Sequence, residues 1–371
     1  MSVTLDGSNG LTFNDGSSQT SAASPFGLKN RIINGDMRID QRNAGAATAN
    51  TVNGYTLDRW QVVQSTTGKL TVQQNAGSVT PPVGFKNYLG VTSSSAYSVG
   101  SGDYYLINQF IEGYNISDLD WGTANAKTIT ISFWVRSSLT GTFGGALNNE
   151  SNVRSYPFTY TISSANTWEQ KTITIAGDTS GTWGSTNSYG IAVRFSLGTG
   201  STYNGTAGAW ATAAYLSATG SQSVVGTNGA TFYVTGVQLE VGSTATPFER
   251  RLYGNELALC QRYYWRLTSS GPDTWIPAWT TTTTQARAMF QFPVIMRASP
   301  TAVETSGTVT DYGVTSTTST VNCNAVPAFG GASSTFMALL NFNVASGLTA
   351  GQGCAGRIQT STSYIGFSAE L

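Results

Sequence analysis

Short segments in which apolar and polar residues alternate constrain the fold of this chain more than any other feature. In residues 128–136, Ile129, Ile131, Phe133 and Val135 are each separated by one residue of another kind. A period of two is typical of a β-strand with one buried face. The same pattern predicts strands at residues 60–64, 70–73, 88–92, 104–111, 158–162, 172–176, 191–197 and 231–239.

Residues that favour turns separate these segments. Clusters rich in Gly, Ser, Thr and Asn occupy residues 141–145, 177–184 and 198–208, where we expect turns or loops. Many short strands interrupted in this way indicate a β-sandwich or jelly roll. The alternation returns at residues 286–292, 336–344 and 364–368, which predicts a second, smaller sandwich.

One segment has the period of a helix. Residues 253–266 contain no turn-forming residue after Asn255, which is a suitable helix cap. Leu252, Cys260 and Tyr263 or Tyr264 would share one face of a helix of two or three turns. A helix this short needs packing, so we expect it at a domain junction or a subunit interface.

The predicted fold is therefore all-β, a jelly-roll β-sandwich followed by a short helix and a smaller distal β-sandwich. We divide the chain into an N-terminal segment (1–28), a jelly-roll domain (29–250), a connecting helix (251–267) and a distal domain (268–371). Residues 1–28 contain few apolar residues and should need a neighbouring chain or a larger assembly to become ordered.

The charged and metal-binding residues exclude several classes of function. The chain has 19 basic and 19 acidic residues, no histidine and three cysteines. Without a basic cluster we expect no binding of nucleic acid, and without an apolar run of about 20 residues no membrane insertion. The absence of histidine removes the usual general base and the commonest zinc ligand, and the cysteines are too far apart for a paired metal site. We expect no cofactor and no metal.

The carboxylates do not predict catalysis either. Asp118 and Asp120 are close in sequence, as are Asp36 and Asp40, but neither pair belongs to a known glycosidase motif. Acids near turns usually cap them or face solvent. The chain contains no Gly-x-Ser-x-Gly motif of a serine hydrolase. We therefore predict no catalytic residue and no enzyme.

Several blocks of sequence resemble a domain that is common in bacteriophage tail fibres. KNRIINGDMRIDQR and LDRW resemble the start of that domain, and VQLEVG and ATPFERR resemble its end. ELALCQRYY is similar to the helix that follows in those proteins, and FPVIMRASPT to their distal module. The blocks keep the order of the family and occupy residues 29–42, 57–60, 237–242, 245–251, 256–264 and 292–301.

The resemblance implies a function. The central domain of these fibres resembles a carbohydrate-binding jelly roll, and the fibres are usually homotrimers. This implies a virion protein, made in the host cytoplasm, that binds other tail proteins through residues 1–28 and a glycan or protein of the host surface. Such jelly rolls often hold a structural calcium between two acids. Here Arg38 stands where the first acid is expected and Thr235 and Gly236 near the second, so we assign no metal.

Two other functions are compatible with the sequence. The chain could be a purely structural tail adaptor or baseplate component whose surfaces bind only virion proteins. It could also be a polysaccharide depolymerase, although these enzymes usually contain long parallel β-helices with a regular repeat, and no such repeat is present.

Exposed aromatic rings are the residues that we expect to bind a host glycan. Trp275 and Trp279 lie close to Pro277 and other turn formers, which predicts a position in or near a loop. Three further candidates in the distal domain are Tyr312, Tyr364 and Asn324. The alternative is that these aromatics fill a small core or a trimer interface.

A second group of aromatics lies in the central domain. Trp183, Tyr203 and Trp210 occur in glycine-rich loops and could line a groove at one end of the jelly roll. The alternative is that they pack beneath those loops. We place Trp60, Trp134 and Trp168 in the core or on a sheet face, because they lie in or beside predicted strands. We expect Arg59, which is next to Asp58, to form a structural ion pair rather than to contact a ligand.

Overall fold

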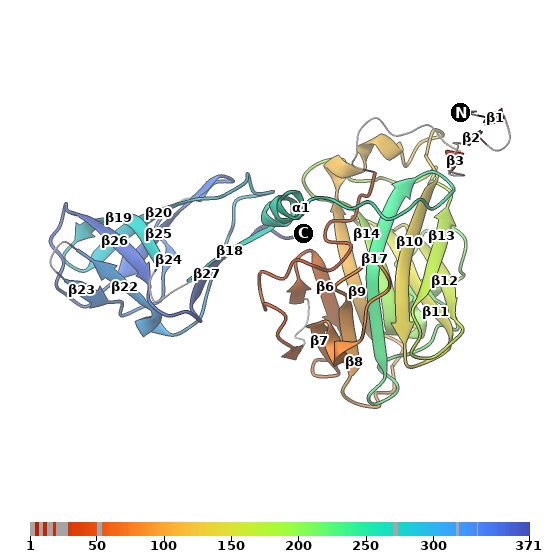
Figure 1. Ribbon diagram of the computed structural model, residues 1–371, viewed down its shortest axis with the longest axis horizontal. Helices are drawn as coiled ribbons and strands as arrows, with labels where there is room; N and C mark the ends of the chain where they lie inside the picture. The colour runs from red at the N-terminus through yellow and green to blue at the C-terminus, as the bar shows by residue number, and fades with distance from the viewer. Residues whose placement is uncertain are drawn as a thin grey trace.

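The computed structural model describes residues 4–6, 10–12, 18–19, 29–49, 54–269, 274–316, 319–331 and 333–371 (Figure 1). Most of its regular secondary structure is β-strand, as the alternating pattern predicts. Three short strands near the N-terminus, β1 (Thr4–Asp6), β2 (Gly10–Thr12) and β3 (Ser18–Gln19), form one antiparallel sheet. We predicted that a neighbouring chain or a larger assembly orders residues 1–28, and most of these residues lie outside the described ranges.

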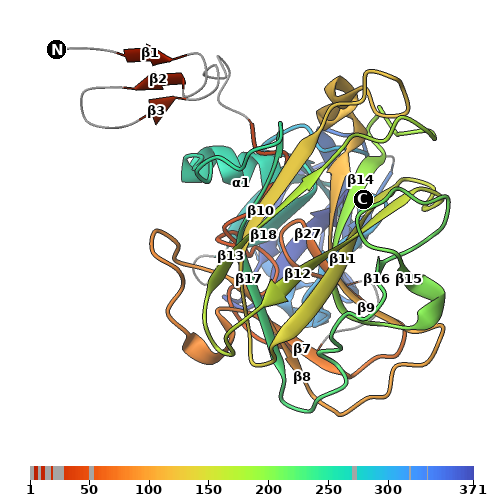
Figure 2. The ribbon, with the colours of Figure 1, turned by 90° about the vertical axis from the view of Figure 1, so that its right-hand side faces the viewer.

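The central domain consists of two six-stranded sheets packed face to face (Figure 2). The first sheet contains, in order across it, β13 (Glu169–Ile175), β10 (Ile129–Ser137), β17 (Thr231–Val241), β8 (Leu89–Ser93), β7 (Leu70–Gln74) and β4 (Thr48–Ala49). The second contains β12 (Ser155–Ile162), β11 (Gly141–Asn149), β14 (Tyr189–Thr199), β9 (Tyr104–Glu112), β6 (Trp60–Gln64) and β5 (Gly54–Leu57). A parallel pair is formed by β15 (Asn204–Gly205) and β16 (Ser217–Ala218).

The inward-facing residues of both sheets form a continuous hydrophobic core. Phe133 of β10 lies 4.9 Å from Phe195 of β14, ring centre to ring centre, and Trp60 of β6 is completely buried beside them. Each large apolar side chain buried in this way contributes roughly 1.5–3 kcal/mol. This confirms the predicted jelly-roll type of β-sandwich.

The glycines at the start of β11 correct one predicted turn. Residues 141–145 begin a strand that pairs with β12, and Gly145 also pairs with Phe195 of β14. A Cβ at Gly145 would lie 2.2 Å from the carbonyl oxygen of Arg194 and 2.5 Å from the ring of Phe158. Gly145 is therefore required for close packing inside the sheet.

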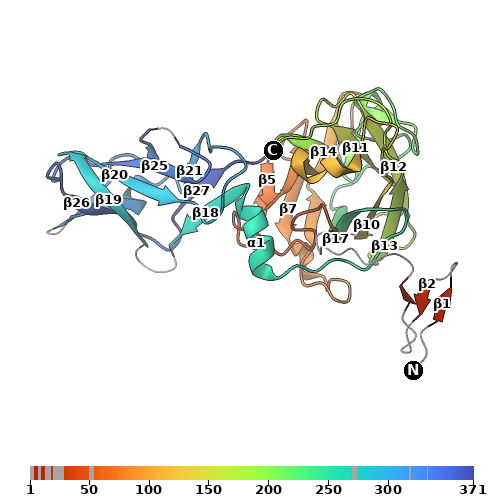
Figure 3. The same ribbon diagram turned by 90° about the horizontal axis from the view of Figure 1, so that it is seen from above.

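The helix α1 (Tyr253–Gln261) lies between the two β domains (Figure 3). It is shorter than the predicted helix, because the chain is extended again from Tyr264, where β18 (Tyr264–Thr268) begins. Cys260 and Tyr263 are buried, as expected, but the side chain of Leu252 is 77% exposed and does not share their face. In the described ranges, no helix is both long and apolar enough to traverse a lipid bilayer.

Short 3-10 helices complete the helical structure of the described residues: η1 (Ala76–Ser78), η2 (Gly113–Asn115), η3 (Ser117–Leu119), η4 (Ser201–Tyr203) and η5 (Val309–Asp311).

The distal domain is a second, smaller sandwich. Its three-stranded sheet contains β18, β27 (Tyr364–Ser368) and β21 (Val303–Thr305). Its seven-stranded sheet contains, in order across it, β23 (Thr320–Asn322), β22 (Tyr312–Thr315), β26 (Gly353–Ile358), β19 (Thr274–Thr282), β20 (Gln285–Gln291), β25 (Met337–Asn343) and β24 (Ala328–Phe329). Phe290, Phe342 and Phe367 belong to a hydrophobic core that is separate from the central one.

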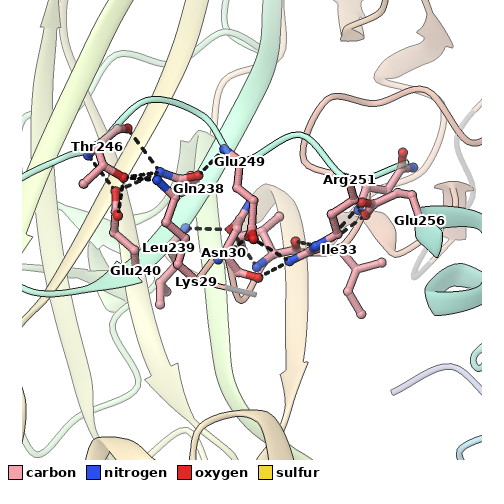
Figure 4. Close-up of polar contacts among 12 residues, drawn as sticks. Lys29, Asn30, Ile33, Gln238, Leu239, Glu240, Thr246, Glu249, Arg251 and Glu256 are labelled. Atoms are coloured by element: carbon pink, nitrogen blue, oxygen red, sulfur yellow. Dashed lines mark hydrogen bonds and ion pairs between the residues drawn. The ribbon is translucent and has the colours of Figure 1, made fainter. Parts of the chain in front are cut away.

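A buried polar network joins the blocks of sequence that resemble the tail-fibre family (Figure 4). The side chain of Asn30 accepts hydrogen bonds from the backbone of Ile32 and Leu239, and the backbone N–H of Asn30 donates to Glu249 at 2.8 Å. Arg251 pairs with Glu256 of α1 at 3.3 Å. The start and the end of the domain therefore interlock beside β17, which gives these blocks a structural role.

Arg38 is part of the same region. Its guanidinium lies 3.4 Å from Asp36 and 3.8 Å from Glu256, and it donates to the backbone oxygen of Arg251 at 2.7 Å. The positive side chain of Arg38 therefore balances the two acids beside it. Across the described residues, no group of three or more Cys, Asp and Glu side chains is arranged to hold a metal ion.

The junction between the domains contains buried ion pairs. Arg59 is 1% exposed and contacts Glu370, which also lies 3.3 Å from Arg42. The predicted structural ion pair of Arg59 is confirmed, with Glu370 as the partner. The carboxylate of Asp58 accepts a hydrogen bond from the backbone of Gln41 at 2.7 Å. Arg59 adopts a left-handed φ of 69°, and its side chain is directed toward the C-terminal end of the chain.

A second buried ion pair lies beside the first. Glu112 at the end of β9 accepts from Arg262 at 2.6 Å and from the hydroxyl of Tyr263 at 2.6 Å. Both acids of the junction are almost completely buried, so their charges depend on these partners.

Candidate functional sites

Two tryptophans stand on the outward face of the seven-stranded sheet. Trp275 is 57% exposed and Trp279 is 41% exposed, whereas Ile276 and Thr280 of the same strand point into the domain. The predicted loop is therefore a strand, β19. Pairing with β20 begins at Ala278, one residue after Pro277, so the strand tolerates a residue without an N–H there.

We call this surface the distal platform. It consists of outward-facing residues of three adjacent strands, which border a shallow groove of about 560 Å³ near Trp279. Its members are Trp275, Pro277, Trp279, Met289, Gln291 and Met337. A separation of four residues along a strand places the two indole rings about 13 Å apart.

Cationic and amide side chains surround the platform. Arg357 lies opposite Trp275 on β26, with its guanidinium carbon 4.9 Å from the centre of the indole ring. Arg287 lies opposite Trp279 on β20 and donates to Asn341 at 3.3 Å. The surface thus combines flat aromatic faces with hydrogen-bonding groups, which suits a ligand with both apolar and hydroxyl-bearing faces.

The other three distal candidates do not belong to the platform. Tyr312 is completely buried, and its hydroxyl donates to the backbone oxygen of Tyr364 at 2.6 Å, so it is a core residue and cannot face a ligand. The ring of Tyr364, on the other sheet, is covered by the guanidinium of Arg266 at 3.6 Å. Asn324 is exposed beyond the end of β23.

A second candidate site, the central groove, lies on the outward face of the second sheet of the central domain. It has a volume of about 380 Å³. The floor consists of side chains from β6, β9 and β14, and loop residues form the walls. The lining residues are Gln61, Val63, Tyr104, Leu106, Asn108, Phe110, Asn152, Tyr189, Arg194, Tyr203, Ala214, Leu216 and Leu371.

Aromatic pairs and one buried cation shape this groove. Tyr104 and Tyr203 meet edge to face with ring centres 5.5 Å apart, and Phe110 and Tyr189 lie 4.9 Å apart. Arg194 is only 7% exposed, and burial lowers the pKa of its guanidinium to about 10, so it stays charged at neutral pH.

Tyr203 is thus the one residue of the central groove that the sequence predicted. The floor residues were missed because each alternates with core residues along a strand. The signal that identifies Arg194 is a charged residue between Val193 and Phe195, both of which are completely buried.

Trp183 and Trp210 are not among the residues that line the central groove. Together with Trp121 they form a cluster in which the ring centres lie 4.7, 5.3 and 5.4 Å apart in edge-to-face contact. The indole N–H of Trp210 donates to the backbone oxygen of Ala176 at 2.8 Å. These two half-buried tryptophans therefore pack against Trp121 and the core, which favours the alternative of a packing role.

The acids that are close together in the sequence have structural partners. Asp118 pairs with Arg31 at 2.6 Å and Asp120 with Lys127 at 3.4 Å. Asp40 accepts hydrogen bonds from the backbone of Asn43 and Gly45, both at 2.8 Å, and so stabilises a turn. Burial raises the pKa of Asp36 and of Asp40 above its usual value.

Comparisons with known proteins give only distant structural similarity. No protein-family model matches the sequence, and no curated protein matches it. A putative sugar binding protein from Bacteroides thetaiotaomicron is 12% identical, with a TM-score of 0.35 over 58% of this chain and 100% of the other. The family 11 carbohydrate-binding module from Clostridium thermocellum is 11% identical, with a TM-score of 0.28 over 53% and 96%.

A third similar structure is the enzymatically active domain of tailspike protein 4 from bacteriophage CBA120. It is 13% identical, with a TM-score of 0.32 over 57% of this chain. The match spans 21% of the tailspike chain. At TM-scores below 0.5 these similarities carry no argument about function, which we base on the surfaces described above.

Proposed function

We propose that this protein is a bacteriophage tail fibre that binds a host surface glycan reversibly, and that the distal platform is the binding surface. The single observation that carries the proposal is the pair of exposed tryptophans on one face of β19. Large apolar side chains gathered on a surface usually mark an interaction site, and indole rings present a flat face to the C–H side of a sugar.

The assembly follows from the same proposal. The resemblance of residues 29–42 and 237–264 to tail fibres supports a homotrimer in the virion, attached to the tail through residues 1–28. Three copies of one platform would raise the apparent affinity through effective concentration, so each site can be weak. The protein needs no catalytic residue for this role, and we propose that it is not an enzyme.

A second candidate function is that of a structural tail component. It is favoured by Met289 and Met337, which make part of the distal platform apolar and suitable for a protein partner. In that case the tryptophans would lie in an interface with another copy of the chain or with another virion protein.

A glycan array probed with the purified full-length protein, followed by titration of the glycans that bind, tests the proposal. Trp275→Ala and Trp279→Ala should each abolish binding while the mass of the assembled particle stays unchanged. The matched control is Tyr114→Ala, which removes an aromatic ring that is 60% exposed in the central domain.

The results separate the two functions. If the tryptophan variants lose their oligomeric mass, the platform is a protein interface and the structural function is correct. If they bind glycans as the control does, the platform is not the binding surface.

A further inference from the structure

The floor of the central groove contains a row of polar side chains at matching positions of three strands. Arg194 of β14 lies opposite Asn108 of β9, and Asn108 lies opposite Gln61 of β6. All three line the groove. Because neighbouring strands are about 4.8 Å apart, the row spans about 10 Å, the length of a small ligand.

Arg194 is the unusual member of this row because it is buried without an acid. In the described part of the chain, no carboxylate, including that of Leu371 at the groove edge, lies within 4.0 Å of its guanidinium. The Nη2 atom donates to Asn152 at 2.8 Å, but the buried Nε atom has no partner. The nearby Oδ1 atom of Asn108 is also buried without a partner.

Other arginines whose side chains are largely buried are neutralised. Arg59 contacts Glu370, Arg251 pairs with Glu256 at 3.3 Å, and Arg154 pairs with Asp178 at 2.6 Å. An unpaired buried charge is costly for a fold. The charge of Arg194 therefore indicates an anionic group that binds from outside the chain.

The rest of the groove indicates what carries that anion. Tyr104, Phe110, Tyr189 and Tyr203 surround Arg194 with aromatic surface, and Phe110 lies 5.8 Å from its guanidinium carbon. The volume of about 380 Å³ is within the range of small-molecule sites. Aromatic faces beside amides and an arginine suit a sugar ring that bears a carboxylate.

We propose that the central groove is a binding site for an acidic sugar, whose carboxylate pairs with Arg194 and whose ring packs against the aromatic wall. This site is separate from the distal platform and does not depend on it. The chain would then contact a host surface at two separate places, a glycan at the distal platform and an acidic sugar at the central groove.

Saturation-transfer NMR with the full-length Trp275→Ala variant, in which the distal platform is disabled, tests this proposal. The probes are D-glucuronate, D-galacturonate, N-acetylneuraminate, methyl α-D-glucoside and inorganic phosphate. At least one acidic sugar should bind about tenfold or more tightly than the neutral glucoside, because hydrogen bonds to charged groups are strong. Adding Arg194→Met should remove that preference, and Arg194→Lys should retain part of it.

A stability measurement keeps the test independent of misfolding. Since Arg194→Met removes an unpaired buried charge, its denaturant midpoint should equal or exceed that of the parent protein. If Arg194→Met does not fold, the proposal of an externally neutralised charge is wrong. Equal binding of acidic and neutral sugars would also overturn it, as would binding of inorganic phosphate in place of every acidic sugar.

Discussion

In the central domain, Trp121, Trp183 and Trp210 pack against one another and the core, whereas in the distal domain Trp275 and Trp279 project from a strand into solvent. Both groups have Gly and Thr among their neighbours in the sequence. The composition around a tryptophan therefore does not reveal whether it stabilises the fold or binds a partner. The difference is made by which side of a sheet or loop layer the ring faces.

The largest expected effect concerns the junction that fixes the two domains to each other. Glu370→Gln removes the negative charge between Arg42 and Arg59, and Arg59 is almost completely buried. Breaking a buried ion pair in this way should lower the free energy of unfolding by about 3–5 kcal/mol. Chemical denaturation followed by tryptophan fluorescence measures the change.

The matched control for the junction is Glu304→Gln. Glu304 lies 3.7 Å from Arg266, but its side chain is 39% exposed. Solvent screening should limit the loss to about 1 kcal/mol or less. Equal losses in the two variants would mean that burial does not strengthen the junction.

Truncating the central tryptophan cluster should have the next largest effect. Trp121→Ala leaves a cavity between Trp183 and Trp210 and should cost about 3 kcal/mol of stability. The same denaturation experiment with Trp275→Ala should show a change within about 0.5 kcal/mol, because an exposed ring has little packing to lose. A large loss of stability in Trp275→Ala would mean that this ring is packed as tightly as the central tryptophans, which would contradict the difference between the two domains.

A smaller effect should appear in the pH dependence of stability. Burial raises the pKa of Asp58 to about 6 from its usual value near 4. The folded state therefore holds this proton more tightly than the unfolded state. Its contribution to stability is complete below about pH 4 and is lost as the pH rises through 6.

Asp58→Asn isolates that contribution. Between pH 7 and pH 4.5 the wild-type protein should gain stability relative to the variant, which we expect to see in denaturant midpoints recorded across that range. Burial also raises the pKa values of Asp36 and Asp40. Their contributions to the pH dependence are the same in both proteins, so they cancel when the stability of the variant is subtracted from that of the wild type. A constant difference across the range would contradict the assigned pKa of Asp58.

Much of the fold could be predicted from the sequence because strand alternation is a local signal. The segment 231–239 is predicted from its period of two, and the structure contains β17 there. Gly145 was misread, since its tight packing against Arg194 and Phe158 depends on strands distant in the sequence. Similarly, Arg59 contacts Glu370, which is distant in the sequence, and no local pattern of residues indicates this partner.

The candidate sites were less predictable for the same reason. Trp275 and Trp279 were identified as a pair, although Pro277 suggested a loop where the structure has a strand. Tyr312 was also predicted to bind a ligand, but its strand, β22, directs the side chain into the core. Arg194 stands out in the sequence as a charged residue between Val193 and Phe195, but the absence of a paired acid becomes visible only in three dimensions.

Radical footprinting of the full-length protein in its native assembly tests the open distal platform most directly. Trp275 and Trp279 should be oxidised readily in the free protein and become protected when a bound glycan is added, while Trp121 should stay unreactive in both conditions. If the two distal tryptophans are already protected without glycan, another protein surface covers them, and the account of the platform as a glycan-binding surface is contradicted.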